Sequence, residues 1–118
     1  MIFDLYCNDG SPLNVLPADI YTRGVGGAEL AMLSWAETMA RRGHTVNIFN
    51  RTSEDTVEPA DGLIFWPQRA YNPNSSADVY IAYRSPNSYL KQVKAPLKIH
   101  WSMDQFTVGN FRTDIFPF

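Results

Sequence analysis

Hydrophobic and polar positions along the chain form short apolar runs of strand length, separated by polar or helical stretches. The first run, Ile2–Cys7, is rich in residues that favour β-structure and ends at the turn signal Asn8-Asp9-Gly10. Later runs of the same kind cover residues 45–49, Val79–Tyr83 and Leu97–Trp101. We therefore expect the main β-strands at these positions.

A helical period occupies the interval between the first two of these runs. Apolar residues return at steps of four, three and four along one face, at Ala28, Met32, Trp35 and Met39. Glu29 in the first turn and Arg41 and Arg42 in the last turn suit the helix dipole. Gly43 suits the left-handed position that ends many helices. The pattern predicts a helix over residues 27–42.

The remaining segments carry weaker signals. The segment between the first strand and the helix reads as a long loop with two prolines, and such loops tend to be functional. The polar residues 51–62 and 71–76 are also expected to be loops. Residues 63–66, closed by a proline, predict a strand at the edge of the sheet. Residues 88–93 are a candidate short helix.

Strands that alternate with helical segments are typical of an α/β fold with a mostly parallel sheet. Short connections and the right-handed crossover rule favour a Rossmann-like order of strands. We expect one open sheet flanked by helices, in a single domain over residues 1–118. In such sheets a ligand binds at the carboxyl ends of the strands.

Composition and charge exclude several classes of function. Hydrophobic residues make up 45% of the 118 residues, which is typical of a globular chain. The net charge of −2 argues against a general nucleic-acid binder, which carries a basic surface. No apolar run approaches the length of a membrane-spanning helix. The N-terminus lacks the basic start of a signal peptide, and Cys7 alone allows no intrachain disulfide, so we expect a cytoplasmic protein.

Three glycines stand directly before the predicted helix, in the stretch Thr22-Arg23-Gly24-Val25-Gly26-Gly27-Ala28-Glu29-Leu30. The first N–H groups of a helix have no partner within the helix, and the helix dipole adds partial positive charge there. Gly26 and Gly27 present no side chain that would block an approaching anion. Because the stretch leads from the first strand into the helix, we expect it at the carboxyl edge of the sheet. There it favours a phosphate or diphosphate.

Two other interpretations of this stretch compete with a diphosphate site. The dinucleotide fingerprint needs glycines at its first, third and sixth positions, and counting from Gly24 the sixth is Glu29. The fingerprint also needs an acidic residue near the end of the second strand, where Asn50 and Arg51 stand. A nicotinamide cofactor is therefore disfavoured. A glycine-rich turn that only starts a helix remains an alternative for this stretch alone.

The glycine stretch is one of several motifs that occur in a characteristic order. Gly26-Gly27-Ala28-Glu29 is followed by the predicted helix and then by Arg42-Gly43-His44-Thr45-Val46. This order resembles the N-terminal domain of retaining GT-B glycosyltransferases of the hexosyl and mannosyl transferase group. Residues 78–84, 99–105 and 114–118 are similar to later segments of that domain, so the resemblance spans nearly the whole chain.

The resemblance implies a domain that works together with a second one. Enzymes of this group have two Rossmann-like domains facing each other across a cleft, the first binding mainly the acceptor and the second most of the donor. The N–H groups of Gly26, Gly27 and Ala28 would then face the donor diphosphate and stabilise the charge that leaves with it. The implied substrates are a nucleotide-sugar and a sugar, lipid or polysaccharide acceptor, with neither a metal nor another cofactor. No catalytic residue is identified.

Three polar residues after predicted strands are candidates for acceptor binding. Arg84 ends the Val79–Tyr83 strand on the crevice side, and Asp104 and Gln105 follow the last predicted strand. A carboxylate such as that of Asp104 can accept a hydrogen bond from a sugar hydroxyl. Met103 stands where many relatives carry a histidine, and it has no proton to give. A contact between such a histidine and the acceptor hydroxyl is therefore not expected here.

The chain ends at Phe118, before the fifth strand and the second domain of such an enzyme. We therefore expect an incomplete N-terminal domain that is inactive alone and lacks its C-terminal domain. The alternative is a non-catalytic binding or scaffold domain that retains the fold. Uncovered apolar surface and an open sheet edge predict self-association, for instance as a homodimer.

The other conspicuous side chains have structural interpretations. Cys7 is expected to be a small buried hydrophobe rather than a nucleophile. His44 is expected to stabilise the turn between helix and strand, and Trp66 and Trp101 to pack rather than to stack on a sugar. A solvated loop is expected to carry the acids Glu54, Asp55, Glu58 and Asp61.

Overall fold

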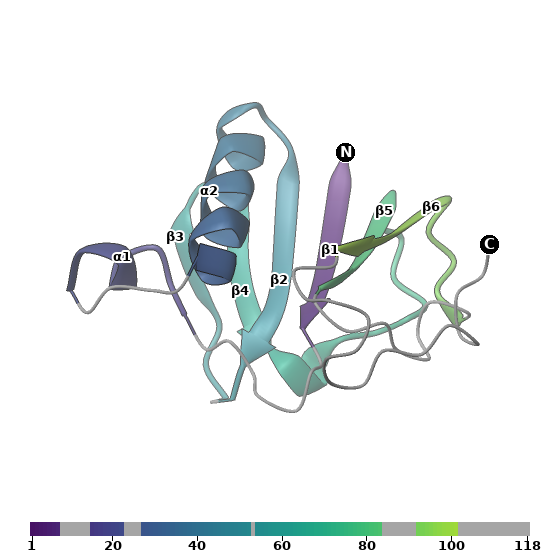
Figure 1. Cartoon of the computed structure of the whole chain (residues 1–118). Coiled ribbons are helices and arrows are strands. Elements are labelled where there is room, and N and C mark those ends of the chain that lie inside the picture. The colour runs from purple at the N-terminus through teal and green to yellow at the C-terminus, as the bar shows by residue number, and fades with distance from the viewer. Residues whose placement is uncertain (8–14, 23–26, 53, 84–91, 102–118) are drawn as a thin grey trace, which may run out of the picture.

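The computed structural model describes residues 1–7, 15–22, 27–52, 54–83 and 92–101, and Figure 1 shows their arrangement. Within these ranges one six-stranded sheet has the order β3-β4-β2-β1-β5-β6. The strands are β1 Ile2–Cys7, β2 Thr45–Arg51, β3 Val57–Ala60, β4 Leu63–Pro67, β5 Val79–Tyr83 and β6 Leu97–Trp101. The helical elements are α1 Asp19–Thr22, α2 Gly27–Arg41 and the 3₁₀ helix η1 Gln68–Ala70.

The sheet is parallel except for β3, which pairs antiparallel with β4. The chain moves outward from β1 through β2 to β4, and then returns to the other side of β1 to form β5 and β6. This order and the parallel pairing confirm the predicted α/β class and are consistent with a Rossmann-like fold. The order reverses between β1 and β5, so their carboxyl ends mark the switch point at which such sheets bind ligands.

One face of the sheet is covered by α2 (Figure 1). Because side chains alternate along a strand, Leu5 and Cys7 of β1 both point to this face and are buried there. Met32, Leu33 and Ala36 of the helix pack against them and are also buried. The apolar stripe that predicted α2 is thus the stripe that faces the sheet.

The C-terminus of α2 forms a Schellman motif. Gly43 has a φ of 91°, and its N–H donates to the carbonyl of Ala40 at 3.0 Å. The N–H of His44 donates to the carbonyl of Met39 at 3.2 Å. These two bonds define the motif and satisfy carbonyls that the helix leaves without partners. The predicted left-handed glycine is confirmed, and His44 stands in the turn that leads into β2, as predicted.

The opposite face of the sheet carries a second, aromatic cluster. Tyr6, Phe49 and Tyr80 are buried there, with Tyr71 and Trp66 packed against the cluster. The Tyr71 ring centroid lies 5.0 Å from those of Tyr6 and Phe49 and 5.6 Å from that of Tyr80. Contacts at such distances are favourable for aromatic rings. Trp66 therefore packs as predicted, and the segment after η1 covers part of this face.

Three predictions about the loops and the edge of the sheet are wrong. Residues 51–62 are not a continuous loop, because Arg51 completes β2 and Val57–Ala60 forms β3. The strand predicted over residues 63–66 is not at the edge, because β3 lies outside β4. The mostly exposed β3 contains Pro59, which an edge strand tolerates because its outer N–H groups need no ladder partner. The long segment before α2 also has structure of its own, in α1.

The other outcomes concern helices. α2 ends one residue before its predicted end. Most of the candidate helix over residues 88–93 lies outside the described residues. No helix in the described ranges is both long and apolar enough to cross a membrane.

Candidate functional site

The parallel strands all end at one edge of the sheet, and this edge holds the candidate site. Their last residues are Cys7, Arg51, Pro67, Tyr83 and Trp101. α2 runs antiparallel to β1 and begins at the same edge (Figure 1). Residues from distant parts of the sequence therefore meet where open α/β sheets bind their ligands.

The N-terminus of α2 offers backbone N–H groups at this edge. Gly27 is the first residue of the helix, and Ala28 lies in its first turn. N–H groups of the first turn have no acceptor within the helix. A Cβ placed on Gly27 would meet no atom within 4 Å in the described structure, so a ligand can approach this backbone closely.

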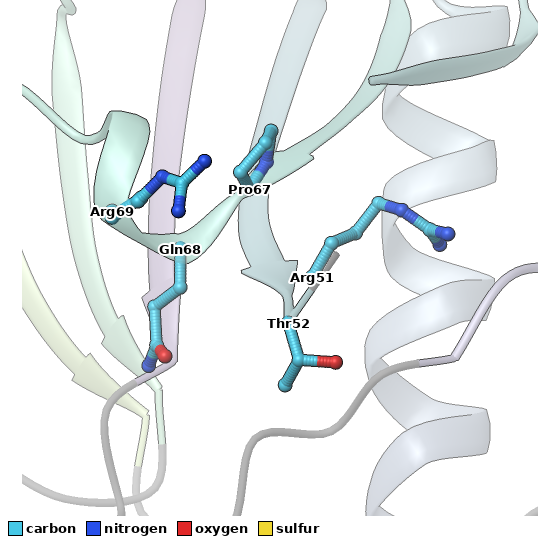
Figure 2. Close-up of a pocket in the computed structure, with 5 residues that line it drawn as sticks. All are labelled: Arg51, Thr52, Pro67, Gln68 and Arg69. Carbon is cyan, nitrogen blue, oxygen red and sulfur yellow. The ribbon is translucent and has the colours of Figure 1, made fainter. Parts of the chain in front are cut away.

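A pocket of about 220 Å³ lies at the same edge, between the ends of β2 and β4 (Figure 2). Its lining residues are Arg51, Thr52, Pro67, Gln68 and Arg69. β2 and β4 pair in parallel with Arg51 opposite Pro67, and the register shifts just before Arg51. This pairing brings two arginine-bearing segments into one pocket.

Arg51 is the more buried of the two arginines that line this pocket. Only 12% of the side chain is exposed, and its Nη2 lies 3.1 Å from Oδ2 of Asp55. Its Nε is buried and has no hydrogen-bond partner among the described residues. An unsatisfied buried donor costs about 1–3 kcal/mol, so the position of this N–H lowers the stability of the fold. Figure 2 shows the Arg51 side chain extending away from Arg69, so the two guanidinium groups do not converge on one point.

Arg69 is the exposed cation of the pocket. It forms an ion pair with Glu54, and both side chains are largely exposed. Exposed ion pairs contribute about 0–1 kcal/mol, so an anionic ligand group can replace Glu54 at little cost. Glu54 and Asp55 are exposed, as predicted for loop acids. Each nevertheless pairs with an arginine of the pocket.

Two amide side chains hold this edge together. Gln68 Nε2 donates a hydrogen bond to the carbonyl of Cys7, which ties η1 to the end of β1. Asn50 Nδ2 donates to the carbonyl of Val15 at 3.2 Å, which ties the end of β2 to the segment before α1. Cys7 itself is buried in the core, as predicted. Both bonds anchor segments beside the pocket, which is lined by the ends of β2 and β4 and by η1.

Of the residues predicted to bind ligands, the structure brings Gly27 and Ala28 to the carboxyl edge. Met103 and the other predicted site residues lie outside the described residues. These site residues are Gly26, Arg84, Asp104 and Gln105. Sequence reasoning missed the roles of Arg51 and Arg69 in a shared pocket. A usable signal is present, because Arg51 ends β2 and Arg69 stands two residues after β4, and the carboxyl edge is built at these strand ends.

No family model, curated protein or solved structure matches the chain. This edge combines the backbone N–H groups of the first turn of α2, two arginine side chains and uncharged polar side chains. That combination suits a phosphorylated or otherwise anionic ligand.

Proposed function

We propose that this chain is the acceptor-side domain of a retaining GT-B glycosyltransferase, which transfers a sugar from a nucleotide-sugar donor to an acceptor. The observation that carries the proposal is the position of Gly27. It starts α2 at the carboxyl edge of a Rossmann-like sheet, and no described atom lies within 4 Å of the position that a Cβ on it would take. The motif Arg42-Gly43-His44 adds support, because it closes α2 and leads into β2 in the order typical of that group.

The proposed role of this helix terminus is electrostatic. When the sugar is transferred, the nucleoside diphosphate leaves with negative charge. The N–H groups of Gly27 and Ala28, with Gly26 before them, would donate to its oxygens, and the α2 dipole would add partial positive charge. Such preorganised donors stabilise the transition state because they need no reorganisation as the charge develops. A C-terminal domain would hold the rest of the donor.

We assign the acceptor to the same edge of the sheet. The pocket between β2 and β4 offers the exposed guanidinium of Arg69, with the more buried Arg51 in its lining. These groups favour an acceptor with an anionic or strongly polar part. Arg84, Asp104 and Gln105 remain proposed acceptor contacts on the strength of the family resemblance.

The proposal is tested by titrating inorganic pyrophosphate into two variants of the chain. Gly27→Ala adds a methyl group where no described atom lies within 4 Å, so the fold should be retained. The methyl group should obstruct the approach of a diphosphate to the backbone and weaken binding. Ser34→Ala, at an exposed position in the middle of α2, is the matched control and should bind like the unmodified chain.

Equal binding by both variants would contradict the assignment of the diphosphate to Gly27. Absence of any response to pyrophosphate would favour the alternative, a non-catalytic binding domain that retains the fold. Tight binding of NAD by the unmodified chain would replace the proposal with a dinucleotide site.

A further inference from the structure

A buried carboxylate lies on the aromatic face of the sheet, away from the carboxyl edge. Asp4, in the middle of β1, is only 3% exposed. Its Oδ1 accepts a hydrogen bond of 3.0 Å from Asn47 Nδ2, and its Oδ2 accepts one of 2.5 Å from Ser75 Oγ. Both partners donate, so each carboxylate oxygen of Asp4 accepts one hydrogen bond.

The orientation of the Asn47 amide is fixed from its other side. Trp66 Nε1 donates to Asn47 Oδ1 at 2.9 Å. Since an indole N–H can only donate, the amide oxygen must face Trp66 and the amide nitrogen must face Asp4. Asn47 lies directly opposite Asp4 in the pairing of β1 with β2. Three strands and the segment after η1 thus contribute to one hydrogen-bond network, made by Asp4, Asn47, Trp66 and Ser75.

This network borders a pocket of about 170 Å³. The polar lining consists of Asp4, Asn47, Asn72 and Ser75, and the rings of Phe49 and Trp66 complete the lining together with Ala70. The two rings are stacked, with centroids 6.1 Å apart and an interplanar angle of 16°. A pocket of this size has room for a small organic ligand.

The charge of Asp4 has no counter-charge in the described structure. No described lysine, arginine or histidine forms an ion pair with it, and the other lining side chains are uncharged. Accordingly, burial raises the pKa of the Asp4 carboxyl, while the bonds from Ser75 and Asn47 lower it. Buried charges in proteins are normally paired. A positively charged ligand in this pocket would supply the partner that the described side chains do not give to Asp4.

We infer that this pocket binds a small organic ammonium ion, with the charged nitrogen at Asp4 and the carbon atoms against the rings of Phe49 and Trp66. A carboxylate supplies the counter-charge and further acceptor capacity for N–H groups. Aromatic faces attract cations through their quadrupole and bury the alkyl part. The pocket lies on the other face of the sheet from α2, so this inference does not depend on the proposed glycosyltransferase function.

The probe is ethanolamine, titrated into the full 118-residue chain. Ethylene glycol is its uncharged counterpart, because it replaces only the ammonium group by a hydroxyl. The Trp66 indole N–H belongs to the network and reports binding in a nitrogen–proton correlation spectrum, with Trp35 on the opposite face as reference. We expect ethanolamine to shift the Trp66 signal saturably in the millimolar range, and ethylene glycol to leave it unchanged.

A variant pair isolates the charge. Asp4→Asn keeps the shape and can keep both hydrogen bonds, since its NH₂ can donate to Ser75, and it should weaken ethanolamine binding about tenfold or more. Ser75→Ala keeps the charge and should retain binding. If Asp4→Asn fails to fold, the comparison of ethanolamine with ethylene glycol still decides the question.

Choline, added as a third probe, distinguishes two forms of the ligand, and both support the inference. A preference for ethanolamine means that N–H donors to Asp4 dominate, whereas a preference for choline means that the aromatic faces dominate. Equal responses to ethanolamine and ethylene glycol would overturn the inference in favour of a neutral polyol site. No response to any probe would overturn it in favour of a purely structural network.

Discussion

Asn47 Nδ2 lies 3.0 Å from Asp4 Oδ1, directly across the pairing of β1 with β2, and so donates to a carboxylate held inside the sheet. The two residues are far apart in sequence, and parallel pairing alone brings them face to face. Since Trp66 fixes the Asn47 amide from the other side, the contact joins three adjacent strands.

The first prediction concerns the pH dependence of stability. Burial raises the pKa of Asp4 above its ordinary value of 3.8, so the folded chain holds this proton more tightly than the unfolded chain. The stability that Asp4 contributes is therefore full below the unfolded pKa and is lost as pH rises through the folded pKa. Asp4→Asn should remove this loss. The free energy of unfolding of Asp4→Asn, relative to the unmodified chain, should rise with pH by about 1.4 kcal/mol for each unit of pKa elevation.

Urea unfolding from about pH 3 to about pH 8 measures this difference from below the unfolded pKa upward. Asp61→Asn, at an exposed turn position, controls for the change in net charge. A stability difference between Asp4→Asn and the unmodified chain that falls with pH would contradict the burial argument.

The second prediction concerns the hydrogen bond between Trp66 and Asn47. Trp66→Phe and Asn47→Ala each remove one partner, and the double variant removes both. The coupling energy from this cycle should be about 0.5–1.5 kcal/mol, the usual net contribution of such a bond. Chemical denaturation of the four proteins supplies the measurement. Effects that add to within about 0.3 kcal/mol would show that the bond contributes nothing.

The third prediction compares two glycines with positive φ. Gly43 has a φ of 91°, and no described atom lies within 4 Å of its Cβ position. A Cβ on Gly62, with a φ of 81°, would lie 3.0 Å from the carbonyl oxygen of His44. Gly43→Ala should lower the free energy of unfolding by about 1–2 kcal/mol, because of the left-handed backbone alone. Gly62→Ala should cost more, because a steric conflict with backbone is added. A larger loss for Gly43→Ala in thermal or urea unfolding would contradict this order.

The fourth prediction separates the two arginines of the carboxyl-edge pocket. Arg51 is mostly buried and paired with Asp55, so Arg51→Ala should cost about 1–2 kcal/mol through lost packing and a lost charged hydrogen bond. Arg69 and its partner Glu54 are exposed, so Arg69→Ala should change stability by less than about 0.5 kcal/mol. Equal losses in the free energy of unfolding for Arg51→Ala and Arg69→Ala would contradict this prediction, because burial of Arg51 would then contribute nothing measurable to stability.

Local patterns were sufficient to predict the main elements. The 3.6-residue period of α2 and the apolar run of β1 reflect burial against one core, so the sequence contains them directly. β3 has no such pattern, because it is exposed at an edge and contains Pro59. The sequence pattern therefore predicts the edge of the sheet at residues 63–66, the nearest apolar run, which form β4.

Both pockets depend on strand register, which no local pattern contains. Arg51 lies beside the segment after Pro67 only because β2 pairs with β4. Asp4 contacts Ser75, which lies 71 residues later in the sequence. Single polar residues inside apolar runs, such as Asp4 in β1 and Asn47 in β2, are nevertheless a usable signal. A buried polar group requires a partner, and two of them in neighbouring strands are candidates for each other.

The most direct test of the proposed function is to locate a nucleoside diphosphate on the chain. Amide signals of the assigned protein are followed while UDP, and separately NAD, is added. The proposal predicts that UDP shifts the N–H signals of Gly27 and Ala28 saturably and more than those elsewhere in α2, and that NAD does not bind tightly. Unchanged signals at Gly27 and Ala28 with UDP, or a stronger response to NAD, would contradict it.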